Sequence, residues 1–268
     1  MKTAVLLLTF VSNIVFCQSG HENLVNEIIA KYKQHRSISY DIDYMIKFFD
    51  SDEPFYVNTS VQSERVESDT IFKGRFLYSR KDSLLDVSKY YDSKHLFVLD
   101  HNKKTITRFN TSQGEIFPIT GNADGNVINT YFLDIERFNK KIHSKEYIVQ
   151  FQDSLSFVKV NIKFPDDEEY YGKEENIYLN KAKKTIDKVT FIAKYKDQVQ
   201  RNHWMLSNII FDGLKENELA YRVDEYFKKY NLEDYKPLTE KDYELLTNGS
   251  VIPRVKGKLY PNYDKESI

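Results

Sequence analysis

The sequence predicts a mainly β protein of the α+β class, in which a curved antiparallel sheet or half-barrel wraps around two or three helices. The chain is rich in Tyr (20) and Phe (18), residues that favour the pleated, half-buried surface of a sheet. Long segments alternate apolar and polar side chains with a period of two, as strands with one buried face do. Short polar turns separate these segments, so consecutive strands are expected to pair as antiparallel neighbours.

Residues 1–17 are predicted to be an export signal. Lys2 precedes an apolar run at residues 4–16 that is too short and too early to span a membrane. Cys17, the only cysteine, stands where this signal ends. Bulky Phe16 before it disfavours lipoprotein processing, so we expect cleavage after Cys17 and a mature chain that begins at Gln18. This predicts a soluble exported protein without a transmembrane segment, periplasmic or associated with the outer membrane, with acylation of Cys17 as the alternative.

The mature chain opens with an amphipathic helix and then a long strand. Within residues 23–34, apolar side chains recur at helical spacing, and after residue 37 the period changes to two. Further strands are expected at residues 55–61 and 72–78, and residues 95–100 and 105–109 predict a hairpin. One face of the first strand carries Ile38, Tyr40, Ile42, Tyr44, Ile46 and Phe48.

A helical stripe interrupts the strands in the middle of the chain. It runs from residue 124 or 126 to residue 141 and includes Tyr131 and Phe132. Strands are then expected at residues 147–151, 158–164, 176–179, 189–195 and 204–210, and a last helix at residues 217–230. We divide the chain into a signal peptide (1–17), a sheet domain (18–212), a C-terminal helix with a linker (213–247) and a tail (248–268).

Composition and motifs exclude several functions. The 39 basic and 40 acidic side chains nearly cancel, which does not indicate a nucleic-acid partner. The histidines lack the spacing of a zinc site, and the acidic turn at residues 166–169 lacks that of a calcium loop, as does the segment 122–126. We find no nucleophile elbow, phosphate loop or dinucleotide fingerprint. We therefore expect no cofactor, no metal and no catalysis by this chain.

The aromatic interior is the remaining candidate site. Aromatic side chains on one face of the sheet and on its covering helix would line an apolar cavity, or else they simply fill the core. An apolar cavity would take a lipid or another apolar small molecule. The candidate residues are Tyr40, Tyr44, Phe48, Phe76, Phe97, Tyr131, Phe132, Phe191 and Trp204.

The order of elements over residues 22–212 resembles that of the LolA/LolB-like superfamily of periplasmic lipoprotein carriers. Residues 94–108 carry a feature typical of that family, a strand that ends in Asp100 followed by a short turn and a β-branched return strand. The resemblance implies an incomplete barrel around an apolar cavity that holds acyl chains. No arginine of this chain matches the motif of that family's lipid-triggered switch.

A second resemblance covers the whole chain. Residues 37–44, 126–133 and 203–209 are similar to the N-terminal region of exported Bacteroidetes-type proteins that continue into a TlpA-like thioredoxin domain, and residues 248–260 resemble the start of a redoxin domain. Dithiol exchange needs two sulfurs, and no cysteine follows Cys17. The leading hypothesis is an exported, non-enzymatic module of the cell envelope that binds an apolar ligand or a protein partner. The alternative is an accessory region of a thiol:disulfide oxidoreductase whose Cys-x-x-Cys domain is missing from this chain.

Overall fold

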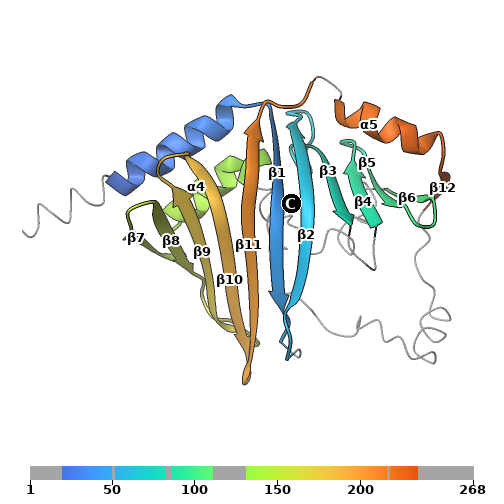
Figure 1. Ribbon diagram of the computed structural model, residues 1–268. Coiled ribbons are helices and arrows are strands. Elements are labelled where there is room, and N and C mark those ends of the chain that lie inside the picture. Colours follow the sequence, from blue (N-terminus) through green and yellow to red (C-terminus); the bar gives the residue numbers. More distant parts are fainter. Residues whose placement is uncertain (1–19, 50–51, 82–85, 111–130, 216–217, 235–268) are drawn as a thin grey trace, which may run out of the picture. The chain divides into compact units, whose positions relative to one another are not determined.

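One sheet of twelve strands organises the part of the chain that the structure describes (Figure 1). The computed structural model describes residues 20–49, 52–81, 86–110, 131–215 and 218–234. The chain divides into two units, Met1–Glu233, which holds the elements below except the last residue of β12, and Asp234–Ile268, of which only Asp234 is described. The strands are β1 (Ser37–Lys47), β2 (Phe55–Arg65), β3 (Gly74–Lys81), β4 (Asp86–Tyr91), β5 (His95–Asp100), β6 (Thr105–Asn110), β7 (Ile148–Asp153), β8 (Phe157–Lys163), β9 (Tyr171–Asn180), β10 (Thr185–Tyr195), β11 (Gln198–Phe211) and β12 (Asn231–Asp234).

The strand order explains why the sheet stays open. It reads β12-β6-β5-β4-β3-β2-β1-β11-β10-β9-β8-β7, so most strands pair with their neighbours in sequence. The exception at the centre is the pairing of β1 with β11, which joins the two halves of the sheet. The edge strands β7 and β12 do not pair with each other, and the predicted fold class, a mainly β protein with a curved, unclosed sheet, is confirmed.

The period-two pattern of β1 fixes the two faces of the sheet. Its side chains from Ile38 to Ile46 are buried at every even position, whereas the odd positions from Ser39 to Lys47 are half-buried or exposed. We call the face of the even positions, together with their register partners on the other strands, the inner face. The opposite face is the outer face. Trp204 of β11 pairs with Tyr44 and therefore belongs to the inner face.

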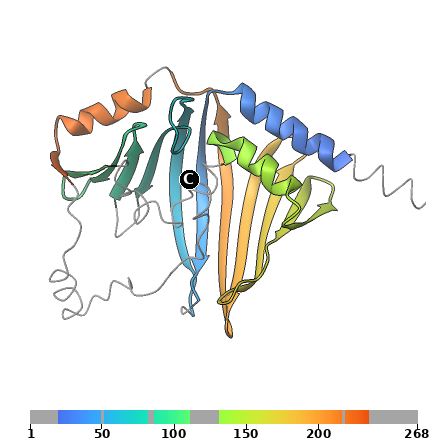
Figure 2. The same cartoon turned by 180° about the vertical axis from the view of Figure 1, so that it is seen from behind.

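Two helices cover the inner face over the half of the sheet from β7 to β11 (Figure 2). The first is the N-terminal helix, residues 20–34, whose Tyr32 ring packs edge-on against Phe211 at 5.3 Å. The second is α4 (Ile135–His143), preceded by helical residues 131–133. Both predicted helices therefore exist, although residues 124–130 of the second prediction lie outside the described residues. Among the described residues, no helix is both long and apolar enough to cross a membrane.

Helix α5 (Glu218–Phe227) packs on the other side of the sheet. Its Leu219 and Val223 are buried against outer-face side chains of β3 to β6, and we call this group the α5 cluster. We expected the helices to lie together on one side. That expectation is wrong for α5, because β5 is apolar on both faces and so offers a packing surface on each. The strand members of the α5 cluster are Leu77, Tyr90, Phe97, Leu99 and Ile106.

Candidate functional site

The inner face brings together most of the aromatic side chains that the sequence singled out on strands. Tyr40 and Tyr44 of β1, Phe76 of β3, Phe191 of β10 and Trp204 of β11 are all buried there. The rings of Tyr44 and Trp204 stack, with centroids 5.4 Å apart and planes inclined by 12°. The long alternation of β1 therefore places these aromatic side chains in one layer, which crosses the seam between the two halves of the sheet at the stack of Tyr44 on Trp204.

The helical side contributes two more of the predicted residues. Tyr131 and Phe132 precede α4 and are buried; the Phe132 ring lies 6.1 Å from that of Tyr32. Phe48 directly follows β1 and is half-buried. Phe97 is not part of this group, because Leu96 and not Phe97 pairs with Tyr91, which is the register partner of Phe76.

Phe97 instead belongs to the α5 cluster on the outer face. Its ring packs edge-on against Phe227 of α5, with centroids 5.0 Å apart. The two predicted processing residues, Cys17 and Gln18, lie outside the described residues.

Among the polar atoms buried on the inner face without a hydrogen-bond partner are the hydroxyl of Tyr40 and the indole Nε1 of Trp204, in side chains that are 2% and 3% exposed. Burial, with smaller contributions from the nearby Tyr78 and Tyr32, raises the pKa of Tyr40 well above its ordinary value. The Tyr40 hydroxyl is therefore a neutral donor in a dry environment.

A buried ion pair ties α4 to the sheet. Glu175 of β9 points to the inner face, where it is 3% exposed, and its Oε2 lies 2.8 Å from Nζ of Lys141 on α4. Tyr131 donates a hydrogen bond to Oε1 of the same carboxylate. A buried carboxylate is tolerated when it is paired and hydrogen-bonded in this way, so both oxygens of Glu175 serve the contact between helix and strand.

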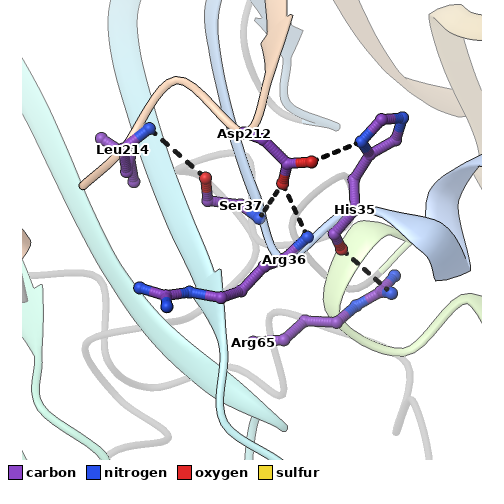
Figure 3. Close-up of polar contacts among 6 residues, drawn as sticks. All are labelled: His35, Arg36, Ser37, Arg65, Asp212 and Leu214. Carbon is purple, nitrogen blue, oxygen red and sulfur yellow. Dashed lines mark hydrogen bonds and ion pairs between the residues drawn. The ribbon is translucent and has the colours of Figure 1, made fainter. Parts of the chain in front are cut away.

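A clasp of polar contacts fixes the end of the N-terminal helix at the end of β11 (Figure 3). The carboxylate of Asp212 accepts hydrogen bonds from the amides of Arg36 and Ser37, at 2.7 and 3.1 Å, and lies 2.7 Å from Nδ1 of His35. Burial of Asp212 acts to raise its pKa, but the hydrogen bonds from His35, Ser37 and Arg36 outweigh burial and hold that pKa below its usual range. In addition, the amide of Leu214 donates to the hydroxyl of Ser37 at 3.4 Å.

Arg65 connects the two covering segments to each other. One guanidinium nitrogen donates to the carbonyl of His35 at 3.4 Å, and another donates to the carbonyl of Phe132. The guanidinium also lies over the Phe132 ring, 4.5 Å from its centroid. Burial lowers the pKa of Arg65, opposed by the nearby Asp134. Arg65 thus holds the end of the N-terminal helix and the start of the α4 segment in one place.

Sequence reasoning gave no role to Arg65, Glu175 or Lys141. A signal for the first two exists in the strand pattern. Arg65 is in phase with the buried Val57 and Val61 of β2, and Glu175 is in phase with the buried Ile177 of β9. A charged residue at an inward position of an amphipathic strand must find a partner, which is how both residues could have been found.

Gly74 allows the α4 segment to approach the sheet closely. A β-carbon at this position would lie 2.4 Å from the carbonyl oxygen of Glu64 and 2.5 Å from a methyl carbon of Leu133. Any other residue would push against backbone on one side and the covering segment on the other. The glycine therefore sets the distance between β3 and the residues before α4.

Two clefts run beside the N-terminal helix. One, of about 400 Å³, is lined by charged side chains that include Asp153 and Lys181. The other, of about 440 Å³, includes Lys31 and Asp187 in its lining. The second cleft reaches the inner face at Phe211, but neither lining includes Tyr40, Tyr44, Phe76, Phe191 or Trp204, and the burial of these five side chains shows that the aromatic layer is closed. Within the described residues, no group of three or more His, Cys, Asp or Glu side chains could hold a metal ion.

Comparison with known proteins finds similarity in structure and not in sequence. No protein-family model and no curated protein matches the sequence. One similar solved structure is a putative outer membrane lipoprotein-sorting protein domain from Vibrio parahaemolyticus, 12% identical with a TM-score of 0.37, and the match covers 74% of this chain and 96% of that chain. A LolA superfamily protein from Nitrosomonas europaea is 10% identical with a TM-score of 0.35, over 72% of this chain and 94% of that one. LprF from Mycobacterium bovis is 9% identical with a TM-score of 0.40, over 72% and 93%.

Proposed function

We propose that this chain is a non-enzymatic binding module of the cell envelope that holds a lipid or another apolar molecule against its inner face. The observation that carries this proposal is the buried aromatic layer on one face of the sheet, which includes Phe76, Tyr40, Tyr44, Trp204 and Phe191. Aromatic side chains bring the largest apolar area to an interface, and an apolar pocket with a few polar groups is the common form of a small-molecule site.

The covering helices bury apolar side chains and are also held at their margins by polar contacts that can be remade. These are the clasp at Asp212, the bonds of Arg65 to two carbonyls and the pair of Glu175 with Lys141. Because the aromatic layer is closed in this structure, a ligand reaches it when the segments above it shift. Directional polar contacts at the margins permit such a shift without loss of the sheet below.

Export to the periplasm is the setting in which this proposal places the chain, and it rests on the signal predicted at residues 1–17. The thioredoxin-related alternative depends on residues 248–268, which lie outside the described residues. Reading the coding sequence beyond Ile268 tests it directly. A continuation into a Cys-x-x-Cys segment would replace the carrier proposal with the accessory-region hypothesis.

The proposal is tested by fluorescence of Trp204, the only tryptophan of the chain. Phospholipids brominated on their acyl chains quench an indole that they contact. We expect saturable quenching of Trp204 in the full chain, and co-purifying lipid in native mass spectra. A Tyr178→Trp variant in a Trp204→Phe background is the matched control, because Tyr178 lies on the outer face and its indole should escape quenching. Absence of both quenching and bound lipid would refute the proposal.

A further inference from the structure

We infer that the molecule bound on the inner face carries hydrogen-bond acceptor oxygens within its apolar part, as an ester-linked acyl lipid does, and that Tyr40 and Trp204 donate to them. This inference rests on the proposed function and narrows it from apolar molecules in general to one chemical class. It also assigns the hydroxyl of Tyr40 and Nε1 of Trp204 as specificity-determining groups.

The two unpartnered atoms carry an energetic cost. A buried donor without an acceptor destabilises a fold by about 1–3 kcal/mol, and native structures leave few such groups. Phenylalanine would fill almost the same space as Tyr40 without this cost. The two side chains lie on the same face of adjacent, paired strands, β1 and β11.

Other tyrosines buried nearby differ from Tyr40 in the hydrogen bonds of their hydroxyls. The hydroxyl of Tyr32 accepts a hydrogen bond from the amide of Ile186 at 3.0 Å, that of Tyr131 donates to Glu175, and that of Tyr91 donates to Asp69 at 2.9 Å. These three hydroxyls make hydrogen bonds that stabilise the folded chain. The Tyr40 hydroxyl is equally buried and makes no such hydrogen bond, although Tyr78 and Tyr32 are near enough to contribute to its raised pKa. An acceptor on a bound molecule would supply the missing hydrogen bond.

The chemistry of the two donors indicates which kind of acceptor the ligand carries. The indole N–H is a donor only, and the Tyr40 hydroxyl is neutral, so it has a proton to donate; burial raises its pKa further above its ordinary value. Of the half-buried cations at the inner face, Lys141 and Arg65 are already engaged, with Glu175 and with two carbonyl groups. Lys89, the register partner of Tyr78, has its pKa lowered to about 8 by burial. Two neutral donors in an apolar layer match neutral acceptors, and a carbonyl oxygen of an ester is the strong neutral acceptor of a lipid.

The spacing of Tyr40 and Trp204 along the sheet indicates how the ligand lies. Trp204 pairs with Tyr44, and Tyr40 lies four positions along β1 from Tyr44. At a rise of 3.3–3.4 Å per residue, the two positions are about 13 Å apart along the strand. The ligand therefore extends along β1, and its acceptors meet the protein at two separate levels.

The experiment compares an ester with its ether. Isothermal titration calorimetry of the full chain with monomeric dihexanoyl phosphatidylcholine and with the matching dihexyl ether gives the two affinities. We expect roughly five- to tenfold tighter binding of the diester for each donor that is used. Tyr40→Phe and Trp204→Phe should each lower the ratio of diester affinity to diether affinity, whereas Tyr178→Phe on the outer face should leave both affinities unchanged.

The outcomes separate the two proposals. Equal affinities for diester and diether would overturn the inference and leave the proposed function standing, whereas binding of neither lipid would overturn the proposed function as well. Thermal unfolding supplies a second readout without ligand. Because the Tyr40 hydroxyl has no partner, Tyr40→Phe should be at least as stable as the wild type, while Tyr131→Phe should be less stable. A strongly destabilised Tyr40→Phe would show that the hydroxyl serves the fold and would contradict the inference.

Discussion

The inner face and the α5 cluster solve the same packing problem in different ways. In both places an amphipathic helix covers aromatic side chains of the sheet. The α5 cluster is held by apolar contacts, and its polar margin is paired through Ser88, His101 and Tyr230, with distances of 2.8 and 3.0 Å from the imidazole nitrogens. The inner face instead contains a buried ion pair and two donors without partners. The outer face also holds a buried atom without a hydrogen-bond partner, Oε1 of Gln62, whose register partner Leu77 belongs to the α5 cluster. The two covered surfaces therefore differ in the kind of unpartnered atom, because only those named on the inner face are donors.

The largest effect is expected from breaking the ion pair of the inner face. Glu175→Leu leaves the ammonium of Lys141 buried without its carboxylate, which should cost about 3–5 kcal/mol of unfolding free energy. Urea denaturation measures this loss. The double variant Glu175→Leu with Lys141→Met removes both charges and should recover most of the stability. A single variant within 1 kcal/mol of the wild type would show that the pair is not desolvated.

A somewhat smaller and more local effect is expected in the α5 cluster. Leu219→Ala creates a cavity against β5 and should cost about 2–4 kcal/mol. Amide hydrogen exchange should show lost protection in α5, β5 and β6. Exchange in the N-terminal helix and α4 should stay unchanged, because they pack on the other face. Loss of protection on both faces would mean that the two surfaces are coupled.

Substitution of Arg65 tests whether the covering segments depend on a cation that donates to two carbonyl groups at once. Arg65→Lys keeps the charge but cannot reach the carbonyls of His35 and Phe132 together, so stability should fall by about 1–2 kcal/mol. Thermal unfolding gives the change. Arg222→Lys, in an exposed pair with Glu218 on α5, is the control and should leave stability nearly unchanged, because solvent screens the pair. Equal effects of the two variants would contradict the role of Arg65.

The smallest effect is expected at the clasp, and it depends on pH. The folded-state pKa of Asp212 is lowered, so its stabilisation is complete above the unfolded value of about 3.9 and is lost as the pH falls through the lower folded value. Asp212→Asn should cost about 1 kcal/mol at pH 7, since the carboxylate is half exposed. Denaturation series from pH 7 to pH 2 should show this difference vanish. A difference that persists at pH 2 would exclude the ionised carboxylate as its cause.

The sequence predicts the fold where strands have one buried face and fails where they do not. The even positions of β1 identify Tyr40 and Tyr44 as partners on one face, as the structure shows. Residues 96–99 are apolar at consecutive positions, so periodicity could not place Phe97 on the outer face, and that placement needed the register with β4. Strand β4 was missed because Ser88 and Lys89 put polar side chains on both of its faces.

The candidate site could be predicted only in its apolar part. Aromatic content and alternation lead to the inner-face layer, whereas the contacts of Arg65, Glu175 and Lys141 join residues far apart in the sequence. Whether a hydroxyl such as that of Tyr40 finds a partner depends on the positions of atoms that no local pattern determines. The two unpartnered donors therefore emerge only from the three-dimensional structure.

The seam between β1 and β11 has a consequence for the order of folding. More than half of the chain lies between these two strands, whereas most other neighbours in the sheet are joined by short connections. Local hairpins form faster than contacts between distant segments, since closing a longer loop costs more entropy. Each half of the sheet can therefore form first as a meander, and the stack of Tyr44 on Trp204 is completed when the halves meet. The aromatic layer is thus among the last parts of the molecule to form during refolding. The fluorescence of Trp204 reports when it forms.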